Sequence, residues 1–82
     1  MSNMSPVEIF EYKQRWMSSG RNNPITIHSD YRSRAKEWCR TQLDRPCWVY
    51  SEHTDVYEDT IYFEYPQDQN NFAIFLKKIT SS

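Results

Sequence analysis

The sequence contains a single glycine, Gly20, in its 82 residues. Phosphate-binding loops and dinucleotide-binding fingerprints need several closely spaced glycines, so the sequence excludes both. No apolar run approaches the roughly 20 residues of a membrane span, and the first residues lack the pattern of a signal peptide. The two cysteines, Cys39 and Cys47, form no CxxC pair. We therefore expect free thiols, a reducing cytoplasm and no membrane partner.

Lysine and arginine are absent from residues 46–76, a stretch that contains six acidic residues. Residues 12–45 have the opposite balance, with eight basic and three acidic residues. The net charge of −1 hides this asymmetry and argues against a globally basic nucleic-acid binder. Separated charge of this kind usually serves association with a partner. The alternative is that the two halves neutralise each other inside one folded chain.

The hydrophobic periodicity predicts three helices and three strands. Ser5, Pro6 and Glu8 form a helix-entry signature with a capping box, and Gly20 is placed to end that helix. The predicted helices are residues 6–19, about 31–43 and the segment after Asp68. The predicted strands are residues 25–28, 46–53 and 56–65.

These elements give the order α-β-α-β-β-α and the fold class α+β. A strand, a crossover helix and a second strand form a right-handed unit, and a hairpin then pairs the second and third strands. We expect a three-stranded mixed sheet in the order 1-3-2, with helices packed on it and residues 56–65 as the middle strand. This arrangement resembles half of a ferredoxin-like fold with an extra N-terminal helix. The chain is expected to be one domain, 1–82, with loose ends at 1–4 and 80–82.

Alternation along the last two strands predicts two different sheet faces. The core face is expected to carry Cys47, Val49, Ile61, Phe63 and Tyr65. The other face, which we call the acidic aromatic face, is expected to carry Trp48, Tyr50, Glu52, Glu58, Tyr62 and Glu64. That face is open to a partner only if the first helix leaves it uncovered.

Residues with catalytic or metal-binding chemistry lack the spacing that such sites need. Cys39, Cys47, His28 and His53 contain no short paired spacing of the kind that structural zinc uses. Cys47 and His53 are predicted on one strand face but are six residues apart, roughly 20 Å at the rise of a strand. We therefore expect no metal, no cofactor, no catalytic residue and no enzyme activity.

Basic residues recur on the predicted second helix at Arg32, Lys36 and Arg40, a spacing that forms a basic ridge. Such a ridge can follow a phosphate backbone, which makes a nucleic-acid-binding protein the alternative function. The carboxylates between the aromatic residues would repel phosphate, so the ridge and the acidic aromatic face do not cooperate.

Protein binding accounts for the residues of the acidic aromatic face better than nucleic-acid binding does. Its three rings are large anchors, and its three carboxylates form a charged rim that would steer a host or viral protein with a basic surface. A homo-oligomer is a second form of protein binding that the residues allow. In it, the basic helix of one copy would contact the acidic hairpin of another. The residues therefore predict a non-enzymatic protein-binding module.

The run TDVYEDTIYFEY at residues 54–65 is followed by an acidic turn with Asp68 and a helix that carries Phe72 and Phe75. Together these features resemble small accessory proteins of tailed bacteriophages, in particular the T4-like and cyanophage types. The preceding helix with Trp38 and Cys39 and the strand with Trp48 are similar too, so the resemblance covers residues 31–75. It implies a viral protein in the cytoplasm of a bacterial host, which binds and modulates a host or viral complex. It supplies no catalytic residues.

Overall fold

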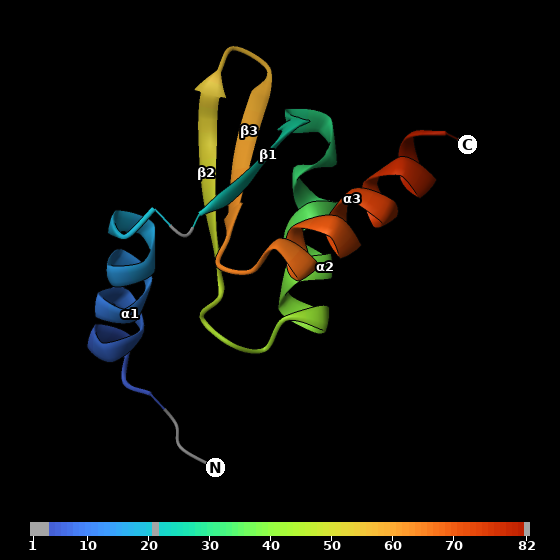
Figure 1. Cartoon of the computed structure of the whole chain (residues 1–82). Coiled ribbons are helices and arrows are strands. Elements are labelled where there is room, and N and C mark those ends of the chain that lie inside the picture. Colours follow the sequence, from blue (N-terminus) through green and yellow to red (C-terminus); the bar gives the residue numbers. More distant parts are fainter. Residues whose placement is uncertain (1–3, 21, 82) are drawn as a thin grey trace.

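The computed structural model describes residues 4–20 and 22–81, which follow the expected order α-β-α-β-β-α (Figure 1). The helices are α1 (Pro6–Ser18), α2 (Arg32–Gln42) and α3 (Pro66–Thr80). The strands are β1 (Asn23–His28), β2 (Trp48–Asp55) and β3 (Glu58–Phe63), and a short 3-10 turn, Ser29–Tyr31, precedes α2. The expected α+β fold class is confirmed.

The sheet has the order β1-β3-β2, so the most strongly β-forming segment is the central strand, as expected. Both neighbours run antiparallel to β3, where a mixed sheet was expected. The crossover through α2 makes β2 run in the same direction as β1. Because β3 returns between them, each neighbouring pair is antiparallel.

The sheet stands between α1 on the left and the pair α2 and α3 on the right (Figure 1). The core lies on the side of α2 and α3, and consists of Ile27, Ala35, Cys39, Leu43, Cys47, Ile61, Phe63 and Phe72. The ring of Phe72 lies 5.4 Å from that of Phe63 and meets the Trp38 ring edge-on at 5.3 Å. Helix α1 reaches only the lower part of the sheet (Figure 1).

The predicted faces of β2 are wrong by one residue. Trp48 lies opposite Phe63 and Tyr50 lies opposite Ile61, so both rings share the core face, while Val49 pairs with Tyr62 on the other face. The position of the turn does not cause this error. A two-residue turn at 54–55, as expected, or at 56–57, as observed, pairs even-numbered residues of β2 with odd-numbered residues of β3, so Trp48 and Tyr50 share the face of Ile61 and Phe63 in both cases.

Several expected boundaries also move. Helix α3 begins at Pro66, which suits the first helical position, and Tyr65 is its N-cap, 40% exposed and outside the core in which it was expected. The C-terminal residues 80–81 are not loose, since Thr80 is helical and its hydroxyl donates to the Leu76 carbonyl at 2.9 Å. Residues 1–3 and 82, which were also expected to be loose, and Arg21 in the predicted connection lie outside the described residues.

Replacement of Phe72 by Ala removes a fully buried ring between β3 and α2. We expect it to lower the free energy of unfolding by about 3–5 kcal/mol, measured by urea denaturation followed by circular dichroism. Phe10→Ala is the matched control, because Phe10 is 60% exposed and its loss should change stability by no more than about 0.5 kcal/mol. Equal effects of the two substitutions would contradict this assignment of the core.

Candidate functional site

The six residues of the predicted acidic aromatic face do not form one surface. Trp48 and Tyr50 are half-buried against the core, and each ring is covered by a cation. The Lys13 ammonium lies 5.3 Å from the centre of the Trp48 ring, and the Lys36 ammonium lies 5.1 Å from that of Tyr50. Tyr62 is half-buried on the opposite face. The three predicted anchors therefore cannot contact one partner together.

Glu64 is buried by α1 and is not part of an exposed rim. It is only 8% exposed, and the Tyr12 hydroxyl lies 2.9 Å from each of its carboxylate oxygens. The hydrogen bond to Glu64, with burial as the second cause, raises the pKa of Tyr12 above its ordinary value. Trp16 fixes the same helix, because its indole N–H donates to the Pro46 carbonyl at 3.0 Å. Helix α1 thus covers the end of β3.

Glu52 is occupied by cations of α2. Its carboxylate binds the Lys36 ammonium, and the Arg32 guanidinium lies 3.7 Å away. The hydrogen bond from Lys36 lowers the pKa of Glu52. Glu58 is the only member of the predicted rim that is exposed and without an ion pair among residues 4–20 and 22–81.

The cations of the basic ridge on α2 lie close to carboxylates of the same chain. Arg32 binds Asp59, Lys36 binds Glu52, and Arg40 lies 4.0 Å from Glu37. Along this ridge, basic residues of the first half of the sequence therefore form ion pairs with acidic residues of the second half within the same fold. A phosphate backbone would have to displace these carboxylates to use Arg32 and Lys36.

The most highly connected polar group of the site, the carboxylate of Asp59, was not predicted from the sequence. Asp59 is fully buried, yet it accepts four hydrogen bonds. Arg32 donates twice, from Nε at 2.7 Å and Nη2 at 3.2 Å, and the Tyr50 hydroxyl donates at 2.6 Å. The backbone N–H of His53 donates at 2.9 Å. These donors, Arg32 first, hold the pKa of Asp59 well below its ordinary value, so it is a buried but paired charge.

A signal for this cluster was present in the sequence. Asp59 is in phase with Ile61 and Phe63 on β3, and a carboxylate in phase with core residues requires a partner. The missing information was the identity of the donors, which come from α2, from Tyr50 in the regular part of β2 and from the distorted part of β2. In that part the pairing shifts between Ser51 and Asp55, and His53 adopts a left-handed conformation with φ of 57°.

The turn that follows this distortion lies at the top of the sheet (Figure 1). Two of its large apolar side chains are exposed. Val56 is 74% exposed and Tyr57 is 66% exposed. The Tyr57 ring stacks on His28, with 6.0 Å between ring centres and 8° between planes. The Tyr57 carbonyl accepts from the Ser29 N–H at 2.9 Å, and the Asp55 carboxylate accepts from the Val56 N–H at 2.8 Å. The exposed turn is therefore fixed to β1 and to itself.

Exposed carboxylates surround these two side chains. Asp55 and Glu58 flank them in the chain and make no ion pair among the described residues, and Asp30 lies 3.5 Å from His28. We call this surface the hairpin tip, formed by His28, Asp30, Asp55, Val56, Tyr57 and Glu58. It combines exposed apolar surface with acidic charge, the combination that was predicted on the sheet face.

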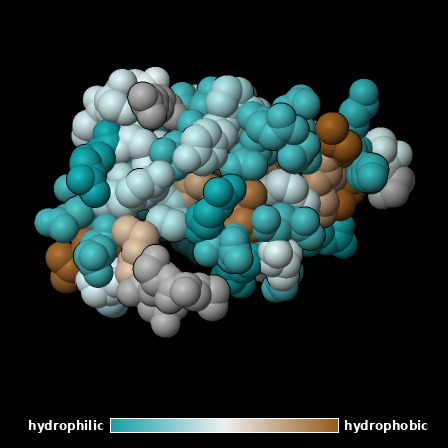
Figure 2. Space-filling model, turned by 60° about the horizontal axis from the view of Figure 1, so that its bottom comes forward, coloured by the Kyte–Doolittle hydropathy of each residue, from teal (hydrophilic) through white to brown (hydrophobic). Residues whose placement is uncertain are grey.

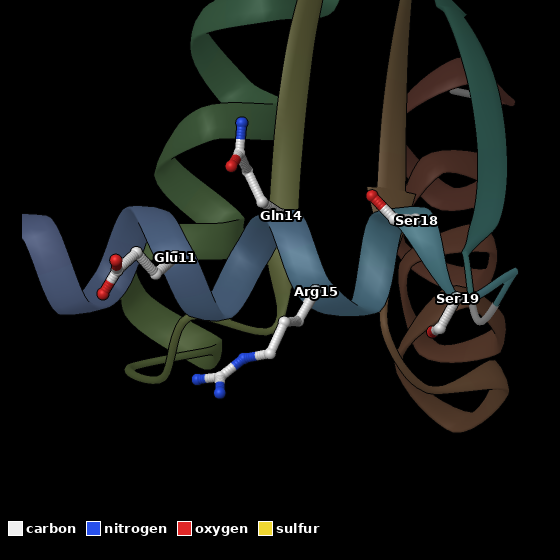
Figure 3. Close-up of a pocket in the computed structure, with 5 residues that line it drawn as sticks. All are labelled: Glu11, Gln14, Arg15, Ser18 and Ser19. Carbon is white, nitrogen blue, oxygen red and sulfur yellow. The ribbon is translucent and has the colours of Figure 1, made fainter.

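A hollow of the surface lies on the outer side of α1. The polar side chains that line it point in different directions (Figure 3), namely Glu11, Gln14, Arg15, Ser18 and Ser19. Across residues 4–20 and 22–81, no three His, Cys, Asp or Glu side chains are grouped so that they could hold a metal ion. No helix in that part of the chain is long and apolar enough to cross a membrane.

Both cysteines are free and buried in the core. Burial raises the pKa of Cys39 to about 12 and that of Cys47 to about 11. The thiolate is the reactive form of cysteine, so we expect native protein at pH 8 to react with a thiol reagent far more slowly than protein in denaturant. Fast labelling of the native state, followed by absorbance, would contradict the placement of both thiols.

Asp59→Asn removes the carboxylate that Arg32 binds at 2.7 Å and leaves Arg32 only the more distant Glu52, 3.7 Å away, so we expect it to lower the free energy of unfolding by about 3 kcal/mol at neutral pH. Because the folded-state pKa of Asp59 is lowered, its contribution is complete above the unfolded pKa and is lost as pH falls. Wild-type stability should therefore decline between about pH 5 and pH 2, and Asp59→Asn should flatten that decline. Urea titrations at several pH values measure both.

The matched control for this substitution is Glu58→Gln, which alters the adjacent, exposed carboxylate of the same strand. Its effect on stability at neutral pH should stay within about 0.5 kcal/mol. If Asp59→Asn were equally mild, Asp59 could not be the centre of the network.

No family model matches the chain, and neither the curated proteins nor the solved structures gave a match.

Proposed function

We propose that this protein is a non-enzymatic binding module that recognises another protein through the hairpin tip. The observation that carries the proposal is the exposure of Val56 and Tyr57, 74% and 66%, on a turn whose backbone is fixed by hydrogen bonds. The tip replaces the acidic aromatic face as the contact surface, because Trp48, Tyr50 and Glu64 are covered in the fold.

A fixed aromatic side chain suits an interface. Tyrosine is enriched at the centres of protein interfaces, where it contributes a large apolar area and a polar hydroxyl. Tyr57 is held by its stacking on His28 and by the hydrogen bond from Ser29 to its carbonyl. Because the turn is already ordered, binding loses less conformational entropy than it would with a flexible loop.

The charge of the tip defines the chemistry of the partner. Asp30, Asp55 and Glu58 are exposed carboxylates beside the apolar pair. Such a surface attracts a partner with a basic patch and repels phosphate backbones. The nucleic-acid alternative gains no support here, since Arg32 and Lys36 already bind carboxylates. With the resemblance to phage accessory proteins, the proposed partner belongs to a host or viral complex in the bacterial cytoplasm.

The test compares affinity capture from bacterial lysate by wild type, Tyr57→Ala and Phe10→Ala, followed by quantitative mass spectrometry. Phe10 is a matched control, because it is an aromatic residue of similar exposure, 60%, on a different element. We expect Tyr57→Ala to weaken capture of the partner at least about tenfold, since an interface hot spot contributes about 2 kcal/mol or more. Phe10→Ala should capture it as wild type does.

Circular dichroism establishes that each variant is folded before capture is compared. Added salt should weaken capture by wild type, because it screens the carboxylates of the tip. The proposal would be wrong if folded Tyr57→Ala recovered the same proteins in the same amounts as wild type.

A further inference from the structure

A second uncovered surface lies between α2 and α3. It is a groove of about 410 Å³ lined by Ser33, Arg34, Glu37, Trp38, Thr41 and Phe75. Its size falls within the range of about 300–1,000 Å³ that is common for ligand clefts. We call it the α2–α3 groove.

The floor of the groove is aromatic. The rings of Trp38 and Phe75 stack with 5.7 Å between their centres, and Phe72 supports both from the core. Ile74, next to Phe75 in the chain, is 50% exposed. Hydrophobic colour gathers over the C-terminal half of α3, at the right-hand end of an otherwise mostly hydrophilic face (Figure 2). The groove is thus an apolar surface with polar surroundings.

Unpaired cations stand near the groove. Arg34 lines it and lies one helical turn before Trp38, and Lys78 lies one turn after Phe75. Both are exposed, and neither makes an ion pair among the described residues. Glu37 also lines the groove, but it lies 4.0 Å from Arg40, which offsets its charge. The net charge offered to an occupant is positive.

The hairpin tip has the complementary character. It presents Val56 and Tyr57 between the carboxylates of Asp55 and Glu58, whereas the groove presents two rings near Arg34 and Lys78. The tip cannot reach the groove of its own molecule, because the Ser29 N–H holds the Tyr57 carbonyl against the end of β1. A contact between the two surfaces therefore needs two molecules.

We propose that the α2–α3 groove of one molecule receives the hairpin tip of a second copy. Tyr57 lies against Trp38 and Phe75, and the carboxylates of the tip face Arg34 and Lys78. The inference rests on the proposed function, since it uses the same tip and names the basic partner surface. The contact joins two different surfaces, so each molecule offers one tip and one groove. A tip and a groove bury little area, and small interfaces associate weakly.

The test is analytical ultracentrifugation over a wide concentration range with wild type, Tyr57→Ala, Arg34→Glu and Arg15→Glu. Arg15→Glu is the charge-matched control, because Arg15 is exposed on α1 and does not line the groove. We expect wild type and Arg15→Glu to gain mass with concentration. Tyr57→Ala and Arg34→Glu should each weaken this association at least about tenfold, and salt should weaken it in wild type.

Mixing the two defective variants gives the sharpest result. Tyr57→Ala retains an intact groove and Arg34→Glu retains an intact tip, so their mixture should form a one-to-one complex and nothing larger. Each variant alone should remain monomeric at the same total concentration. Association of Arg34→Glu as strong as that of wild type, or no complex in the mixture, would overturn the proposal.

The two proposals fail in different ways. If wild type stays monomeric at every concentration while Tyr57→Ala loses a captured partner, the second copy is not the occupant and the binding function of the tip stands. If Arg34→Glu loses a captured foreign protein while wild type stays monomeric, the groove binds that protein, and the second copy is again overturned. If Tyr57→Ala associates and captures as wild type does, the tip is not a binding surface and both proposals are wrong.

Discussion

The hydrogen-bond network around the buried carboxylate of Asp59 is the interaction on which the rest of this small fold depends. An unpaired charge at this position would destabilise the protein by several kcal/mol, so its donors must be in place together. They come from α2 through Arg32, from β2 through Tyr50 and from the distorted segment through the backbone of His53. A single side chain of the central strand thus couples one helix, one neighbouring strand and the position of the hairpin turn.

The same network decides which charges reach the surface. Arg32 and Lys36 are bound to Asp59 and Glu52, so the basic ridge is largely neutralised. The distortion that brings the His53 N–H to Asp59 also moves the turn to Val56 and Tyr57 and leaves acidic residues around it. The unequal distribution of charge along the sequence thus remains visible on two smaller exposed surfaces. These are the acidic hairpin tip and the basic edge of the α2–α3 groove.

The order of the elements, the central strand and most of the core were predictable because they depend on local periodicity and on helix-capping residues such as Ser5 and Gly20. The faces of β2 were assigned wrongly although they were predictable, because any two-residue turn pairs even-numbered residues of β2 with odd-numbered residues of β3 and so places Trp48 and Tyr50 with Ile61 and Phe63. The irregularity between Ser51 and Asp55, which moves the turn to residues 56–57, was not predictable, since the turn lacks an Asn-Gly or Asp-Gly pair that would define its register. Glu64 was misassigned because its partner, Tyr12, is far away in the sequence. Asp59 could have been suspected from its phase alone.

Helix α1 has a consequence for the dynamics of the protein. It is attached at the lower end of the sheet by the indole of Trp16, the hydroxyl of Tyr12 and the Lys13 ammonium over the Trp48 ring, and none of its described residues belongs to the buried core cluster that contains Phe72. Local opening takes place in the parts of a fold with few buried apolar contacts. We therefore expect amide hydrogens of α1 to exchange with solvent through a partial unfolding in which the sheet, α2 and α3 stay intact. Such an opening would hydrate the carboxylate of Glu64 without exposing the core.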